Sequence, residues 1–128
     1  MNGTDLQRGA LAVIGAVGVN LGILAASLAT IGAGGFDPFG VLPVAIATAV
    51  GALGGVVVHA GFRRAFGDVA DRRFVLAALL VTLLSLGLLE PASAFDGATT
   101  ARLGVLGLMH IAAAGVVVGV LVDWKGNR

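Results

Sequence analysis

Charged residues divide the chain into four long stretches that carry no charge, covering residues 9–36, 38–62, 74–89 and 103–122. The third stretch extends to residue 95 if Glu90 lies near a membrane interface. A bilayer core of about 30 Å is crossed by about 20 helical residues, so each stretch has roughly the length of one span. We expect spans at about 9–34, 39–62, 73–94 and 102–123, within a single domain over residues 1–128.

Helices are the expected form of these stretches, because lipid offers no hydrogen-bond partners to an open backbone. The alternating pattern of a membrane barrel is absent from the sequence. The connecting segments 35–40, 63–73 and 95–100 are short, which favours antiparallel neighbours. The predicted fold class is therefore all-α: an integral membrane four-helix bundle with up-down-up-down connections.

The composition agrees with a membrane environment. Hydrophobic residues make up 58% of the 128 residues, charged residues only 12%, and the mean hydropathy is +1.03. Soluble domains have about a quarter of their residues charged. A net charge of +1 provides no basic face for nucleic acid, and the absence of cysteine excludes disulfides and thiolate chemistry. The expected partner is the lipid bilayer.

Basic residues predict the orientation of the spans. Arg102 is the only basic residue on one side, and the other side has seven: Arg8, Arg63, Arg64, Arg72, Arg73, Lys125 and Arg128. Positive charge accumulates on the cytoplasmic side of membrane proteins. We therefore expect a multi-pass protein of the cell membrane with both termini in the cytoplasm. The arginines between residues 63 and 73 are also candidates for contact with lipid headgroups.

One polar side chain from each predicted span falls near the middle of the membrane: Asn20, Thr48, Ser85 and His110. A polar group in hydrocarbon must find a hydrogen-bond partner. His110 is therefore expected to face the bundle interior, with Asn20 or Ser85 as its partner. Such a bond can fix the register of two helices. Alternatively, His110 accepts protons or binds a substrate, as ionisable residues inside membranes often do.

Two further ionisable residues lie away from this layer. His59 is near the inner end of its span, and Glu90 precedes Pro91 near the outer interface, where we expect it to be solvated. Two histidines on different helices suggest a haem with two imidazole ligands. His59 and His110 differ in depth by more than about 10 Å, so haem remains a weak alternative, and no metal site is expected.

Small residues predict close helix contacts. The GxxxG spacing, which lets helices approach closely, occurs at 18–22, 51–55 and 115–119, through Gly18, Gly22, Gly51, Gly55, Gly115 and Gly119. The first span has a polar face and a face of small residues. This pattern fits either contact with another subunit or a central position in the bundle.

No catalytic signature occurs in the sequence: HExxH, GxSxG, a Walker loop and a carboxylate pair inside a span are all missing. We therefore expect a protein that is not an enzyme. The expected function is helix packing, as a homo-oligomer or an accessory subunit of a membrane complex. One alternative is a small transporter or channel that uses the polar layer, and another is a haem-binding membrane anchor.

Overall fold

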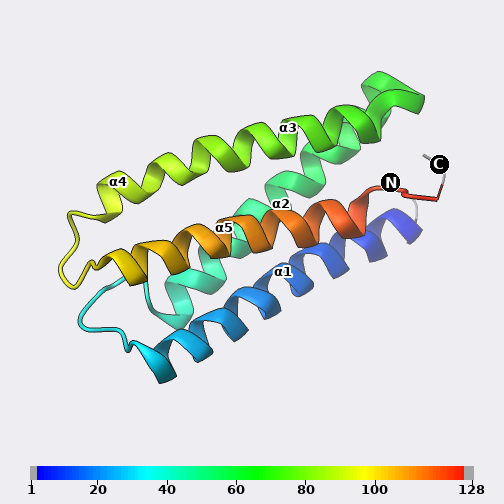
Figure 1. Ribbon diagram of the computed structural model, residues 1–128. Coiled ribbons are helices and arrows are strands. Elements are labelled where there is room, and N and C mark those ends of the chain that lie inside the picture. Colours follow the sequence, from blue (N-terminus) through cyan, green and yellow to red (C-terminus); the bar gives the residue numbers. More distant parts are fainter. Residues whose placement is uncertain (1–2, 126–128) are drawn as a thin grey trace.

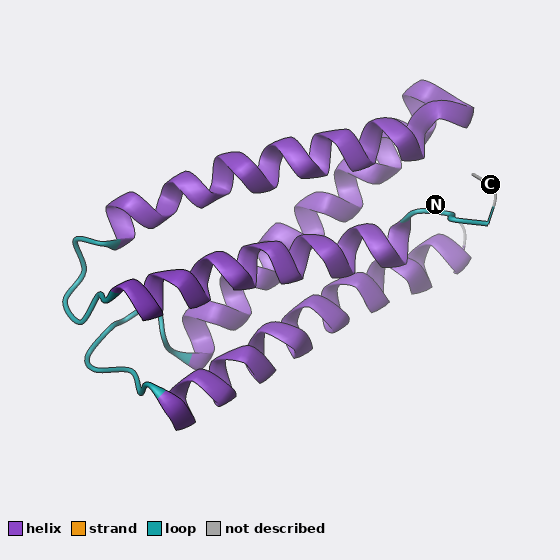
Figure 2. Cartoon of the chain, viewed as in Figure 1, coloured by secondary structure: helices purple, strands orange, loops and turns teal. Residues whose placement is uncertain are grey.

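The computed structural model describes residues 3–125, so Arg128, counted above on the cytoplasmic side, lies outside the described residues. The described chain consists of helices joined by short loops (Figure 2), and the all-helical class is confirmed. Its elements are α1 (Gly3–Thr30), α2 (Val41–Phe66), η1 (Gly67–Val69), α3 (Ala70–Ser85), η2 (Leu86–Leu88), α4 (Leu89–Ala92) and α5 (Thr100–Leu121).

Local sequence explains where the helices begin and end. α2 ends at Gly67, whose φ of +54° lies in the left-handed region that glycine adopts without a Cβ penalty. α5 begins after Thr99, whose side-chain oxygen accepts a hydrogen bond from the Arg102 backbone N–H at 3.1 Å. That bond satisfies one of the free donors at a helix N-terminus.

The helices lie side by side (Figure 1). α1 packs against α2 and α5, whereas α3 packs against α2 and α5 but not extensively against α1. The chain reverses at Gly67, so α2 and α3 meet at one end of the molecule and diverge toward the other. We call the end with residues 63–73 the basic end and the end with loops 31–40 and 93–99 the loop end.

Two clusters of buried apolar side chains form the core, one toward each end. The cluster toward the basic end comprises Ala12, Ala16, Ala52, Phe74, Val117, Leu121 and Val122. The cluster toward the loop end comprises Leu24, Phe36, Phe39, Val44 and Met109. Many large apolar side chains point outward instead, among them Leu42 at 70% exposed and Leu84 at 68%. Soluble monomers rarely expose contiguous apolar surface on this scale.

Three helical stretches, rather than the expected four, have the length and apolar composition to cross a membrane: Gly3–Thr30, Val41–Ala92 and Thr100–Leu121. The expected span at 73–94 does not stand as a separate long α-helix. α3 has 16 residues, or about 24 Å of helix, and a 3-10 turn connects it to the four-residue α4. The three stretches are consistent with a membrane protein.

Candidate functional site

A cleft of about 780 Å³ lies between α2, α3 and α5. Its walls are mainly apolar, and residues of η2 and α4 extend it toward the loop end, where Asp37 lies at its edge. All of the residues expected in the middle polar layer line this cleft, and so does Thr82 of α3. Ligand sites in proteins commonly have this size and this mixture of apolar walls with a few polar groups.

Asn20 and Thr48 form the only hydrogen bond between two side chains that line the cleft, among the described residues. The Asn20 Nδ2 donates to the Thr48 Oγ1 at 3.0 Å, and this joins α1 to α2. Both side chains are buried, with Asn20 at 3% exposed. The Asn20 Oδ1 is buried without a hydrogen-bond partner. A buried acceptor in that state carries an uncompensated desolvation cost.

His110 does not have the partner that the sequence suggested. Its Nδ1 is 2.7 Å from the carbonyl oxygen of Leu106 on the same helix, so neither Asn20 nor Ser85 bonds to it. The Ser85 hydroxyl likewise donates to the carbonyl of Thr82 at 2.7 Å. Polar side chains one turn from a helix carbonyl satisfy themselves locally. For this reason the expected interhelical bond at His110 does not form.

Most of the hydrogen-bond capacity left in the cleft is that of acceptors, apart from the Thr48 hydroxyl, which accepts from Asn20 and keeps its own proton. A carbonyl oxygen can only accept, so the Nδ1 of His110 is the donor to Leu106, and the Nε2 is an acceptor in the tautomer that has its proton on Nδ1. Thr82 donates its hydroxyl proton to Ala78 at 2.7 Å, and both Thr82 and Ser85 retain oxygen lone pairs. Together with the Asn20 Oδ1, these atoms favour a ligand that donates.

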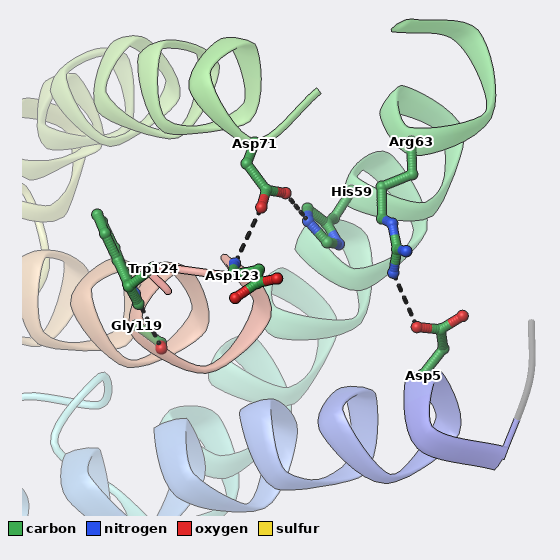
Figure 3. A network of polar contacts seen from close by, with 7 residues as sticks. All are labelled: Asp5, His59, Arg63, Asp71, Gly119, Asp123 and Trp124. Atoms are coloured by element: carbon green, nitrogen blue, oxygen red, sulfur yellow. Dashed lines mark hydrogen bonds and ion pairs between the residues drawn. The ribbon is translucent and has the colours of Figure 1, made fainter. Parts of the chain in front are cut away.

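At the basic end, Asp71 connects three parts of the chain (Figure 3). Its Oδ1 is 2.8 Å from the Nε2 of the buried His59 on α2. Its Oδ2 accepts from the backbone N–H of Asp123 at 2.9 Å, just beyond α5. The His59 ring also packs edge-on against Phe74, with ring centroids 4.8 Å apart. Asp71 therefore holds α2, α3 and the end of α5 together.

A second pocket of about 590 Å³ lies beside this connection, between the start of α1 and the end of α2. Arg8, Arg63 and Arg64 line it together with Asp5, and Arg63 donates to Asp5 at 2.9 Å (Figure 3). Arg72 and Arg73 are not part of its lining. The guanidinium of Arg73 instead lies 4.3 Å from the ring centroid of Phe66. The structure thus divides the arginines expected at the headgroups into two groups.

At the loop end, Arg102 joins the two loops through backbone carbonyls. Its Nε donates to Gly32 at 3.0 Å, its Nη1 to Gly97 at 2.7 Å and its Nη2 to Ile31 at 3.1 Å. Two of these bonds hold the segment just after α1, at Ile31 and Gly32, and the third connects it to the loop that contains Gly97. From the count of charges, Arg102 is only the single basic residue on the side opposite the other seven.

Only Gly55 of the six GxxxG glycines packs against another helix within the described chain. A Cβ there would lie 2.9 Å from Val117 Cγ1 on α5. At the other positions a Cβ would meet no atom within 4 Å. Gly51 lines the central cleft, and the outward-facing glycines are Gly18, Gly22, Gly115 and Gly119. The spacing is the same at all three repeats, but the direction of each face decides which glycine makes contact.

The remaining ionisable candidates lie apart from each other. His59 lines the pocket at the basic end, and His110 lines the central cleft, so the structure does not bring the two imidazoles to one haem site. Glu90 is exposed on α4 and does not line the cleft. Among residues 3–125, no three acidic, histidine or cysteine side chains form a group that could hold a metal ion.

The sequence interpretation missed Asp71 and Arg102 as structural residues. Asp71 is the second residue of α3, and His59 lies seven residues before the end of α2, so a regular antiparallel hairpin would place their backbones about 10 Å apart along the helix axis. Residue spacing alone therefore did not indicate this pair. The bonds of Arg102 depend on where two glycine-rich loops meet, and residue spacing carries no such information.

Together, the helices and the cleft define a small all-helical protein whose apolar helices have the length of membrane spans. The chain belongs to a family of unknown function, DUF6069, whose model matches residues 2–124. A comparison with curated proteins finds no match. A comparison with solved structures also finds none.

Proposed function

We propose that this protein is a four-span membrane protein that binds a mostly apolar molecule with a hydrogen-bond donor in its central cleft, as a small carrier or transporter. In this proposal the Val41–Ala92 stretch crosses the membrane twice, both termini lie in the cytoplasm and the cell membrane is the location. The protein acts by binding and by helix contact rather than by catalysis. The unpartnered Asn20 Oδ1 beside the cleft is the observation that carries the proposal.

A buried acceptor without a partner favours a ligand because it lowers stability until something donates to it. The neighbouring hydroxyl oxygens and the His110 Nε2 add acceptors at the same cleft. The apolar walls from α2, α3 and α5 match an alkyl chain or ring system.

The experiment compares two ligands that differ only in the donor, dodecanol and dodecyl methyl ether. Binding is measured with radiolabelled ligand on the protein in lipid nanodiscs, corrected for empty nanodiscs. One hydrogen bond of about 1 kcal/mol corresponds to roughly fivefold tighter binding of the alcohol. The Asn20→Leu variant should lose this preference. Equal binding of both ligands to the unaltered protein would refute the proposal.

Ser27→Ala is the matched control variant. Ser27 is a buried polar residue on the same helix, but it donates to its own helix at Ile23 and does not line the cleft. It should therefore keep the full preference for the alcohol. Loss of the preference in both variants would indicate a general effect on α1 and would count against the cleft as the binding site.

The proposed topology has an independent test because the chain contains no cysteine. A single cysteine in place of Asp68, between α2 and α3, or of Asp96, between α4 and α5, is then the only reactive thiol. In intact cells a membrane-impermeant maleimide should label Asp96→Cys, and it should label Asp68→Cys only after permeabilisation. Labelling of both from the same side would exclude a double crossing by Val41–Ala92.

Helix packing within an oligomer or a larger complex is the second candidate function. It is favoured by the outward-facing glycines on α1 and α5, namely Gly18, Gly22, Gly115 and Gly119, because such faces let another helix approach closely. Native mass spectrometry of gently purified protein should give whole multiples of the chain mass, and Gly22→Leu should reduce them. Gly87→Leu, at an exposed glycine of η2 outside the repeats and outside the cleft lining, is the control. A monomer without added mass contradicts this function.

A further inference from the structure

The pocket at the basic end has a different chemistry from the central cleft. Arg8 of α1 and Arg63 and Arg64 of α2 line it together with His59, and among residues 3–125 Asp5 is the only acidic residue in the lining. The ion pair between Arg63 and Asp5 at 2.9 Å fixes one guanidinium and cancels one positive charge. The other two arginines give the pocket a net positive charge.

Topology alone does not explain this arrangement. The positive-inside rule is satisfied by basic residues anywhere near the ends of the spans, as Arg72 and Arg73 illustrate outside the pocket. Here, three arginines from two helices that are far apart in the sequence border one hollow. Ala60, with a single methyl group, and Gly61, with no side chain, form part of its wall, which leaves the guanidinium groups room for a bulky anion.

The remaining lining residues indicate that this anion is attached to something apolar. Val56 and Leu121 form an apolar part of the same pocket. Arginine is suited to phosphate because its planar fork donates two parallel hydrogen bonds to phosphate oxygens. A phosphate group on an apolar stem satisfies both parts of the lining.

We propose that this pocket binds a phosphate group, with Arg8 and Arg64 as the main donors and Arg63, held by Asp5, as the third. Its position at the ends of α1 and α2 corresponds to the headgroup level in the proposed topology. The phosphate belongs to the headgroup of an anionic lipid or to a soluble phosphate ester. The site does not share a lining residue with the central cleft, so failure of one proposal leaves the other standing.

The test measures lipid binding by native mass spectrometry on delipidated protein. Phosphatidylglycerol is compared with phosphatidylcholine, whose quaternary ammonium cancels the phosphate charge. The protein should bind phosphatidylglycerol at least tenfold more tightly. Arg64→Gln should reduce that affinity about tenfold, whereas Arg72→Gln should change it less than twofold. Arg72 is the matched control because it is exposed, basic and outside the pocket.

A second arm identifies the source of the phosphate. Glycerol 3-phosphate is added in excess to the complex with phosphatidylglycerol, and displacement of the lipid supports a soluble ester as an occupant. Persistence of the complex supports the lipid headgroup. Equal losses in Arg64→Gln and Arg72→Gln would overturn the proposal, because they would mean that only diffuse charge attracts the lipid. The same holds if phosphatidylcholine binds as tightly as phosphatidylglycerol.

Discussion

The bond between Asn20 and Thr48 allows a quantitative test of whether the middle of the bundle is built for stability or for binding. Thr48→Val removes the acceptor of the Asn20 amide and leaves that buried amide without any partner. An unsatisfied buried group costs about 1–3 kcal/mol. Measured hydrogen bonds between membrane helices average about 0.6 kcal/mol and reach about 1.7 kcal/mol. We therefore expect Thr48→Val to lower the free energy of unfolding by about 1 kcal/mol.

Asn20→Leu should behave differently although it breaks the same bond. It removes the orphaned Oδ1 together with the Nδ2, and the Thr48 hydroxyl can turn to a carbonyl of its own helix. The adjoining cleft has room for the larger side chain. Its free energy of unfolding should stay within about 0.5 kcal/mol of the unaltered protein, or rise, because no buried polar group is then left without a partner.

The assay is unfolding by sodium dodecyl sulfate in mixed micelles for both single variants and the double variant. The double variant should recover the stability of Asn20→Leu, and the cycle should give a coupling energy of about 0.6–1.7 kcal/mol. A Thr48→Val protein as stable as the unaltered one would refute the reasoning. So would an Asn20→Leu protein less stable than Thr48→Val. In either case the unpartnered Asn20 Oδ1 would not lower the free energy of unfolding, and it would give no reason to expect a ligand at this position.

Three further predictions concern the two ends of the molecule, all measured by the same unfolding assay. A Cβ at Gly97 would collide with the Gly34 carbonyl and lie 2.7 Å from the Phe36 nitrogen. Gly35 has a similar positive φ but open space around its Cβ position, so Gly35→Ala should cost about 1–2 kcal/mol and Gly97→Ala at least about 1 kcal/mol more. Equal effects would contradict the contact between the loops. Asp71→Ala should cost about 2–3 kcal/mol because it removes two hydrogen bonds to a carboxylate. The control Asp68→Ala, at an exposed position in the same turn, should have little effect. Similar losses in the two variants would refute the role of Asp71. Arg102→Lys should cost about 1–2 kcal/mol because one ammonium cannot reproduce three bonds in a fixed plane, and a variant as stable as the original would show that those bonds contribute nothing.

The distribution of charge along the sequence predicts the helices well. The expected spans at 9–34, 39–62 and 102–123 overlap α1, α2 and α5, with ends displaced by a few residues. The displacement occurs because a helix continues through charged residues at an interface, as α1 does through Asp5 and Arg8. The stretch at 73–94 is interrupted by a 3-10 turn at Leu86–Leu88. Gly87 lies in this turn, and Pro91 has no N–H to donate to the Gly87 carbonyl, so the signal lies in these two residues and not in the distribution of charge.

The candidate site was predictable in its depth and less so in its contacts. Arithmetic on the helix rise selected Asn20, Thr48, Ser85 and His110, and all of them line one cleft. Each bond depends on whether the polar side chain finds its partner on a neighbouring helix or at a carbonyl of its own helix. His110 and Ser85 bond to carbonyls within one turn, which residue type and depth do not reveal. Asn20 instead donates to Thr48 on the neighbouring helix α2.

The contact between α1 and α5 has a consequence for biosynthesis. These two helices share an extensive interface, in which a Cβ at Gly15 would lie 3.1 Å from Val116, yet they are made at opposite ends of translation. While the ribosome is still producing the middle of the chain, α1 has only α2 as a partner, through the Ala12, Ala16 and Ala52 contacts and the bond from Asn20. A chain that stops before α5 therefore leaves uncovered the flank of α1 that packs against Val116.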